Sequence, residues 1–149
     1  MRGKKSIERL VWVILTLLWI GFIFSRSRQS ADVSSEESAS VLEFARRFVP
    51  FLSMRAVRKI AHFTEFLILG VLLHFSFRSL QIRSSALLLG TGLLVAAADE
   101  LLQLFSPGRS CQVTDVLLDF SGVVVSVLFF ALLSRKNVRK TDAAESERQ

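Results

Sequence analysis

The sequence predicts an all-α protein, an integral membrane four-helix bundle with a short amphipathic helix between its first and second spans. Hydrophobic residues make up 51% of the 149 residues and gather into four continuous blocks. Each block is near the length needed to cross about 30 Å of hydrocarbon at about 1.5 Å per residue. Charged or Ser-rich stretches separate the blocks. Continuous apolar runs that are too few to close a barrel favour helices over strands.

The first span is expected at residues 10–24, after a basic segment at residues 1–9. A basic start and a short apolar run are also typical of a signal peptide. The block ends in the bulky residues 22–24, however, and offers no small-residue cleavage site before Ser25. Because three more apolar blocks follow, an uncleaved first helix is the better interpretation.

The stretch between the first two blocks is polar and Ser-rich. Ser34 and Glu37 fit a capping box, which predicts a helix start. The helix would lie at the membrane surface or pack on the mouth of the bundle, and its sequence fits both positions equally. Its apolar stripe consists of Val41, Leu42, Ala45, Phe48 and Val49, and Pro50 ends it.

The three later spans are expected at about 60–77, 86–105 and 116–133. A turn at residues 106–109, with Pro followed by Gly, joins the third span to the fourth. The polar and charged segment at 135–149 predicts a disordered tail.

The distribution of basic residues predicts the orientation. Eleven of the 19 Lys and Arg residues fall on the side that holds both termini, and four of them precede the first span. By the positive-inside rule we expect a multi-pass protein of the cell membrane with both termini in the cytoplasm. The net charge of +6 lies at the ends of apolar blocks, and no nucleic-acid-binding motif accompanies it, so no nucleic-acid partner is expected. Cys111 is the only cysteine, which excludes an internal disulfide.

Ionisable residues inside the apolar blocks indicate a site. Counted from the inner ends of their spans, Glu65, Asp99 and Asp119 lie about 20, 21 and 24 Å deep. On each helix a second polar residue falls three or four positions away, on the same face. Turning a charged group toward lipid costs roughly 2.5–3.5 kcal/mol even on a lenient scale, so one polar cavity in the outer third of the bilayer is expected. The predicted cluster is Arg58, Lys59, His62, Glu65, Asp99, Glu100, Gln103, Arg109, Asp115 and Asp119.

In this predicted cluster the acidic residues outnumber the residues that are reliably positive at neutral pH. We therefore expect a carboxylate that is protonated, or a cation from outside that completes the site. Paired acids can hold a divalent cation, but a zinc site prefers more histidines, and only His62 is well placed. The metal is left unassigned, and no cofactor is predicted.

Two motifs resemble the VanZ-like family of bacterial membrane proteins. The first is Arg58-Lys59-x-x-His62-Phe63-x-Glu65-Phe66, with Gly70 after it, and Ser25, Ser27 and Ser30 precede it in a similar Ser-rich stretch. The second is Asp99-Glu100-x-x-Gln103-x-Phe105-x-Pro107-Gly108-Arg109, followed by Asp115, Asp119 and Gly122. Asp119 stands where the family usually has Asn, and Ser126 where a second Gly is common. The resemblance implies a four-helix transmembrane domain at residues 10–134 and a cell-envelope context. The family is named for a member that raises teicoplanin resistance, and no agreed biochemical activity comes with it.

Three functions remain open. The favoured one is a non-enzymatic protein whose cavity binds a lipid headgroup or a cationic amphiphile and reduces glycopeptide or lipopeptide sensitivity. Its partners would be membrane lipids and a lipid-linked or amphiphilic ligand. The second is a membrane enzyme acting on a lipid-linked headgroup, with His62, Glu65, Asp99 and Glu100 as its catalytic groups. The third is purely structural: the charges pair across helices and fix the bundle.

Overall fold

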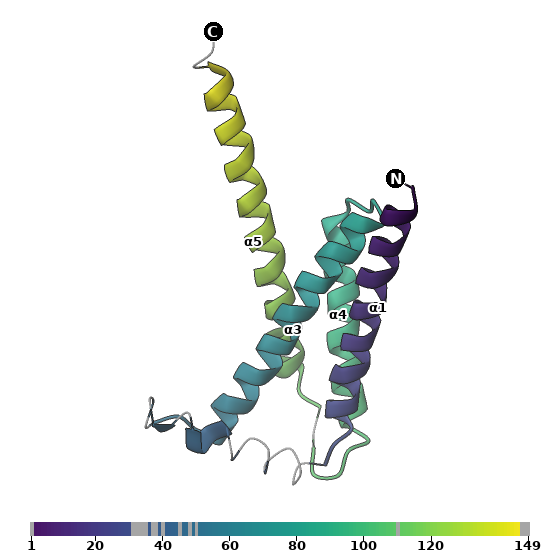
Figure 1. Cartoon of the computed structure of the whole chain (residues 1–149). Coiled ribbons are helices and arrows are strands. Elements are labelled where there is room, and N and C mark those ends of the chain that lie inside the picture. Colours follow the sequence, from purple (N-terminus) through teal and green to yellow (C-terminus); the bar gives the residue numbers. More distant parts are fainter. Residues whose placement is uncertain are drawn as a thin grey trace.

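The computed structural model of the chain describes residues 2–30, 36, 39, 41–44, 46–47, 49, 51–109 and 111–146 (Figure 1). Over these residues the chain forms four long helices and no strand, which confirms the all-α fold class. The helices are α1 (Arg2–Ser27), α3 (Met54–Ser79), α4 (Ser85–Gln103) and α5 (Val113–Ser146).

All four helices are long and apolar enough to cross a membrane, by length and composition. The apolar segments are Ser6–Ser27, Met54–Ser79, Ser85–Gln103 and Val113–Lys136. The first is longer than the 15 residues expected, and its 22 residues span about 33 Å, so no local thinning of the bilayer is needed. Outward-facing leucines such as Leu18, Leu94 and Leu132 are exposed, as a lipid-facing surface requires.

Serine side chains set where two of the helices begin. The Ser53 hydroxyl accepts a hydrogen bond from the Ala56 N–H at 3.2 Å, and α3 therefore begins at Met54. Ser84 caps α4 in the same way through the Leu87 N–H at 3.1 Å. The third span thus begins next to the predicted position, whereas the second begins six residues earlier than predicted.

Helix α5 continues to Ser146, although we expected a disordered tail from residue 135. Residues 135–146 contain no Pro or Gly and are rich in Arg, Lys and Ala, so nothing in the sequence stops propagation of the helix. Residues 147–149 lie outside the described residues.

A short helix lies between α1 and α3, at residues 41–44. Leu42 is buried there, whereas Val41 and Phe44 are exposed. The expected capping box at Ser34 and Glu37 lies outside the described residues, as do Ala45, Phe48 and Pro50.

The α3–α5 crossing depends on small residues. A Cβ added at Gly122 would lie 2.6 Å from the Phe63 carbonyl oxygen and 2.8 Å from the Leu67 nitrogen, so the two backbones touch here. Farther along, a Cβ at Gly70 would lie 2.9 Å from the Ser126 Cβ. Gly70 thus provides the room for Ser126, the residue that departs from the expected Gly.

Helix α1 is joined to α3 by polar contacts within the spans. The Trp19 indole Nε1–H donates to the Glu65 carbonyl oxygen at 3.0 Å, and the Thr16 and Ser76 hydroxyls lie 2.7 Å apart. The apolar core between the helices includes Ile23, Phe66, Leu69, Leu73, Leu88, Val95, Ala96 and Val123. This packing places the end of α1, the beginning of α3, the end of α4 and the beginning of α5 at one end of the bundle, away from both termini (Figure 1).

Candidate functional site

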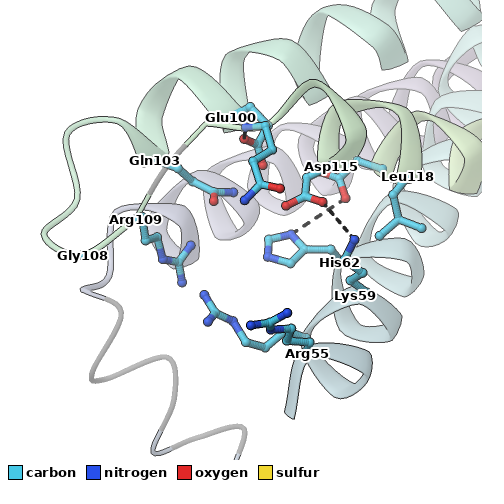
Figure 2. A pocket seen from close by; sticks show the side chains of 12 residues that line it. Arg55, Lys59, His62, Glu100, Gln103, Gly108, Arg109, Asp115 and Leu118 are labelled. Atoms are coloured by element: carbon cyan, nitrogen blue, oxygen red, sulfur yellow. Dashed lines mark hydrogen bonds and ion pairs between the residues drawn. The ribbon is translucent and has the colours of Figure 1, made fainter. Parts of the chain in front are cut away.

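A polar cavity of about 470 Å³ opens at this end of the bundle (Figure 2). Eight of the ten predicted cluster residues line it: Arg58, Lys59, His62, Glu100, Gln103, Arg109, Asp115 and Asp119. The lining also contains Gly108 of the second motif, and Arg55, Gln112 and Leu118, which the sequence did not single out. Glu65 and Asp99 do not line the cavity, but both lie directly against residues that do.

At the floor of the cavity, side chains of three helices point to one place. The His62 Nδ1 atom of α3 lies 3.9 Å from Asp119 Oδ1 of α5 and 4.0 Å from Glu65 Oε2. Ligand atoms of His62, Asp99 and Asp119 all lie within 4.8 Å of one another. Asp99 and Asp119 are almost completely buried, so the helices aim these carboxylates inward and not toward lipid.

Asp99 is held by hydrogen bonds from two helices. The Ser27 hydroxyl of α1 donates to Asp99 Oδ1 at 2.5 Å, and Gln103 Nε2 donates to Oδ2 at 3.2 Å. The Ser106 hydroxyl in turn donates to the Ser27 carbonyl oxygen at 2.9 Å. Sequence reasoning did not assign Ser27 or Ser106 to the site. The only signal was the Ser-rich stretch in which Ser27 lies.

Glu100 ties the α4–α5 loop to the cavity wall. Its Oε2 accepts a hydrogen bond from the Gln112 N–H at 2.9 Å. Gly108 adopts φ 76°, a left-handed conformation that suits Gly and turns the loop back over the cavity. The adjacent Cys111 thiol is exposed, and partial removal from water together with the Glu100 carboxylate raises its pKa.

The mouth of the cavity is basic. Arg55, Arg58 and Lys59 come from the first turns of α3, and Arg109 points in from the α4–α5 loop (Figure 2). Lys59 Nζ lies 3.3 Å from Asp115 Oδ1; the Lys59 side chain is exposed, whereas the Asp115 side chain is partly buried. Arg109 Nε and Nη1 are buried and have no hydrogen-bond partner among the described residues. Burial, reinforced by the nearby Arg58, lowers the pKa of the Arg109 guanidinium, which nevertheless stays charged at neutral pH.

The expected acid excess is offset by two arginines outside the predicted cluster. Arg26 Nε of α1 lies 3.7 Å from Glu65 Oε1, and Arg55 adds a cation at the mouth. The basic residues are Arg26, Arg55, Arg58, Lys59 and Arg109, and they match the five carboxylates Glu65, Asp99, Glu100, Asp115 and Asp119. Charge is nevertheless divided in space: Arg55, Arg58 and Arg109 line the mouth, Asp119 lies at the floor, and Asp99 lies directly behind it.

The comparisons with known proteins agree with the two sequence motifs. No curated protein and no solved structure matches the chain. A family model described as VanZ/LLP1 matches residues 12–134, from within the first span to near the end of the fourth. The matched region contains every residue that lines the cavity. The chain is therefore a multi-pass, four-helix membrane protein that belongs to the VanZ/LLP1 family.

Proposed function

We propose that this VanZ/LLP1 protein is a non-enzymatic protein of the bacterial cell envelope whose cavity binds a phosphate-bearing lipid or lipid-linked headgroup. The observation that carries the proposal is the Arg109 side chain, which lies beside a second arginine at the cavity mouth and presents two buried nitrogens that have no hydrogen-bond partner among the described residues.

The chemistry of Arg109 favours an anionic oxygen ligand. A buried donor that lacks an acceptor costs about 1–3 kcal/mol, and a bound oxyanion removes that cost. A guanidinium offers a planar fork that matches phosphate in a bidentate arrangement. Arg58 and Arg55 add positive charge around the same opening.

The floor of the cavity suits the other part of such a headgroup. Glu100 and Asp119 lie deeper than the arginines and are almost completely buried. A headgroup with a phosphate and an amine can place its phosphate at the mouth and its amine at these carboxylates. A cationic amphiphile without a phosphate would leave the arginines unsatisfied, so the phosphate-bearing ligand is the better fit.

The expected orientation connects this cavity to drug sensitivity. With both termini in the cytoplasm, the cavity faces the outer leaflet, where glycopeptides and lipopeptides meet lipid-linked targets. A protein that binds or shields such headgroups reduces the amount of lipid-linked target that the drug can reach. Reduced glycopeptide or lipopeptide sensitivity, suggested by the resemblance to VanZ-like proteins, follows from that role.

Native mass spectrometry of the purified full-length protein tests the binding proposal. The probes are phosphatidylethanolamine, phosphatidylglycerol and undecaprenyl phosphate, each added separately in detergent. We expect at least about tenfold less retained lipid for Arg109→Ala, because the mutation removes a charge-assisted bidentate contact worth about 1.5–3 kcal/mol. Arg83→Ala changes an exposed arginine at the other end of the bundle and should retain lipid like the parent protein. Equal retention by the two variants contradicts the proposal.

Drug sensitivity is measured in a host in which the parent protein gives a phenotype. Loss of the phenotype in Arg109→Ala at unchanged membrane abundance supports the role in sensitivity. An unchanged phenotype separates lipid binding from drug sensitivity and removes the second half of the proposal.

One observation favours the enzymatic alternative. His62 Nδ1 lies between two carboxylates, 3.9 Å from Asp119 Oδ1 and 4.0 Å from Glu65 Oε2, and an approach of about 1 Å by either carboxylate would orient the imidazole as a base. Purified protein incubated with the same phospholipids would then release a headgroup or phosphate, and His62→Gln would abolish the release. Absence of any release by the parent protein argues for binding alone.

A further inference from the structure

Two side chains at the cavity floor and one directly behind it have the composition of a metal site. His62, Asp99 and Asp119 come from α3, α4 and α5, and their ligand atoms lie within 4.8 Å of one another. An imidazole nitrogen with two carboxylate oxygens is a ligand set used for divalent transition metals. Proximity of acids is not enough by itself, because a buried acidic pair can simply share a proton.

The hydrogen bonding of Asp119 supplies an independent reason to expect a ligand. The side chain is 1% exposed, and neither of its oxygens has a hydrogen-bond partner among the described residues. Among the described residues, its ion-pair partner is His62, whose Nδ1 lies 3.9 Å from Asp119 Oδ1, which is too long for a hydrogen bond. The His62 Nδ1 atom is itself buried and without a hydrogen-bond partner in the described part of the chain. Buried charged groups are normally paired or bound to a metal, so this region lacks a positive partner.

Asp99, unlike Asp119, accepts hydrogen bonds from neighbouring side chains, as expected for a metal ligand whose orientation is fixed. Ser27 donates to one of its oxygens and Gln103 to the other, which fixes the plane of the carboxylate. Hydrogen bonds of this kind orient carboxylates that bind metals while leaving lone pairs for the ion.

We infer that the floor of the cavity binds one divalent transition-metal ion of the Zn²⁺ or Mn²⁺ kind through His62 Nδ1 and the carboxylates of Asp99 and Asp119. Around a tetrahedral ion with ligand distances of about 2.1 Å, neighbouring ligand atoms lie about 3.4 Å apart. The 3.9 Å separation between His62 Nδ1 and Asp119 Oδ1 must therefore shorten by about half an ångström. The other separations in the cluster, which are within 4.8 Å, must shorten by up to about 1.4 Å, which is within the reach of side-chain rotation.

The ion can reach this position from outside the bundle. His62 and Asp119 both line the open cavity, so a hydrated ion enters without crossing the apolar core. The cavity also leaves room for water or another oxygen ligand at the remaining coordination positions. The ion and the headgroup amine proposed above would both use Asp119, so metal binding is measured without added lipid and lipid binding is measured on metal-free protein.

The test measures metal uptake by the full-length protein in detergent, without added lipid and after removal of any affinity tag. The protein is stripped with a chelator, dialysed against equimolar Zn²⁺, Mn²⁺ and Ca²⁺, and analysed by elemental mass spectrometry and thermal unfolding. We expect about one Zn²⁺ or Mn²⁺ per chain, a midpoint of unfolding that rises by several degrees, and no uptake of Ca²⁺, which prefers six to eight oxygens. Absence of stoichiometric Zn²⁺ and Mn²⁺ in the parent protein, or preference for Ca²⁺, overturns the inference.

Variants separate this site from adventitious binding. Asp119→Asn and His62→Gln keep the shape of the side chains, and each should bind the metal at least about 100-fold more weakly, because even the partners that orient a ligand account for about 10- to 100-fold. Glu8→Gln removes an exposed acid near the beginning of α1 and should bind like the parent protein. Unchanged affinity in Asp119→Asn, with a normal elution profile, means that the ion binds elsewhere and contradicts the inference.

Discussion

The contact between Ser27 and Asp99 offers the sharpest test of how the bundle holds its buried acids. Both side chains are fully buried, and the Ser27 hydroxyl donates to Asp99 Oδ1 at 2.5 Å. Ser27→Ala removes this donor without changing the shape of the side chain otherwise. Gln103 still donates to the other oxygen, so the mutation isolates one hydrogen bond.

Two magnitudes compete in the expected loss of stability. Hydrogen bonds between spans of a membrane protein average about 0.6 kcal/mol, because the unfolded helices find other partners in the membrane. Hydrogen bonds to charged groups contribute about 1.5–3 kcal/mol, and a buried oxygen left without its donor adds a desolvation cost. Since Asp99 has no exposed surface, we expect Ser27→Ala to lower the free energy of unfolding by about 2 kcal/mol.

Unfolding in mixed dodecylmaltoside and dodecyl sulfate micelles measures this loss, with Trp12 and Trp19 as fluorescence reporters. Ser25→Ala is the matched control, because its exposed hydroxyl donates to the Phe22 carbonyl oxygen of the same helix, and its loss should stay below about 0.5 kcal/mol. In an Asp99→Ala background, Ser27→Ala should also cost less than about 0.5 kcal/mol. Equal losses in the parent and Asp99→Ala backgrounds would refute the assignment of this contact.

Three further predictions follow from the crossing of α3 and α5 and from the single cysteine. Gly122→Leu should abolish the folded protein in detergent, because a Cβ there lies 2.6 Å from the Phe63 carbonyl oxygen, whereas Gly21→Leu, with nothing within 4 Å, should elute normally in size-exclusion chromatography. A membrane-impermeant maleimide should label Cys111 in intact cells if the termini are cytoplasmic, and labelling only after permeabilisation would reverse the orientation. Because its pKa is raised, the Cys111 thiol should react with maleimide more slowly near pH 7 than a free thiol. Glu100→Gln removes the nearby carboxylate, which should lower the pKa of the thiol and speed labelling. An unchanged rate would contradict the role of Glu100 in raising this pKa.

The sequence alone determined the number of spans, the helical class and the positions of the ionisable residues. These follow from lengths and periodicities that do not depend on neighbours: apolar blocks of bilayer length, and polar pairs three or four residues apart on one face. The cost of exposing charge to lipid then required that these stripes face one another. The sequence predicted the helix boundaries less well, because α5 continues beyond its apolar block into a charged segment that is also a good helix former.

Only the tertiary structure decided which groups meet and which are left without partners. Ser27 reaches Asp99 across 72 positions of sequence, and Arg26 approaches Glu65, because α1 packs beside α3 and α4 at one end of the bundle. Both residues follow the first apolar block as flanking polar residues; nothing in the sequence pointed to Arg26, and for Ser27 the only signal was the Ser-rich stretch in which it lies. The packing of the helices also produces the division of charge between the arginines at the mouth and the carboxylates at the floor. Charge pairing depends on distances of a few ångströms between helices, and periodicity along one helix does not determine these distances.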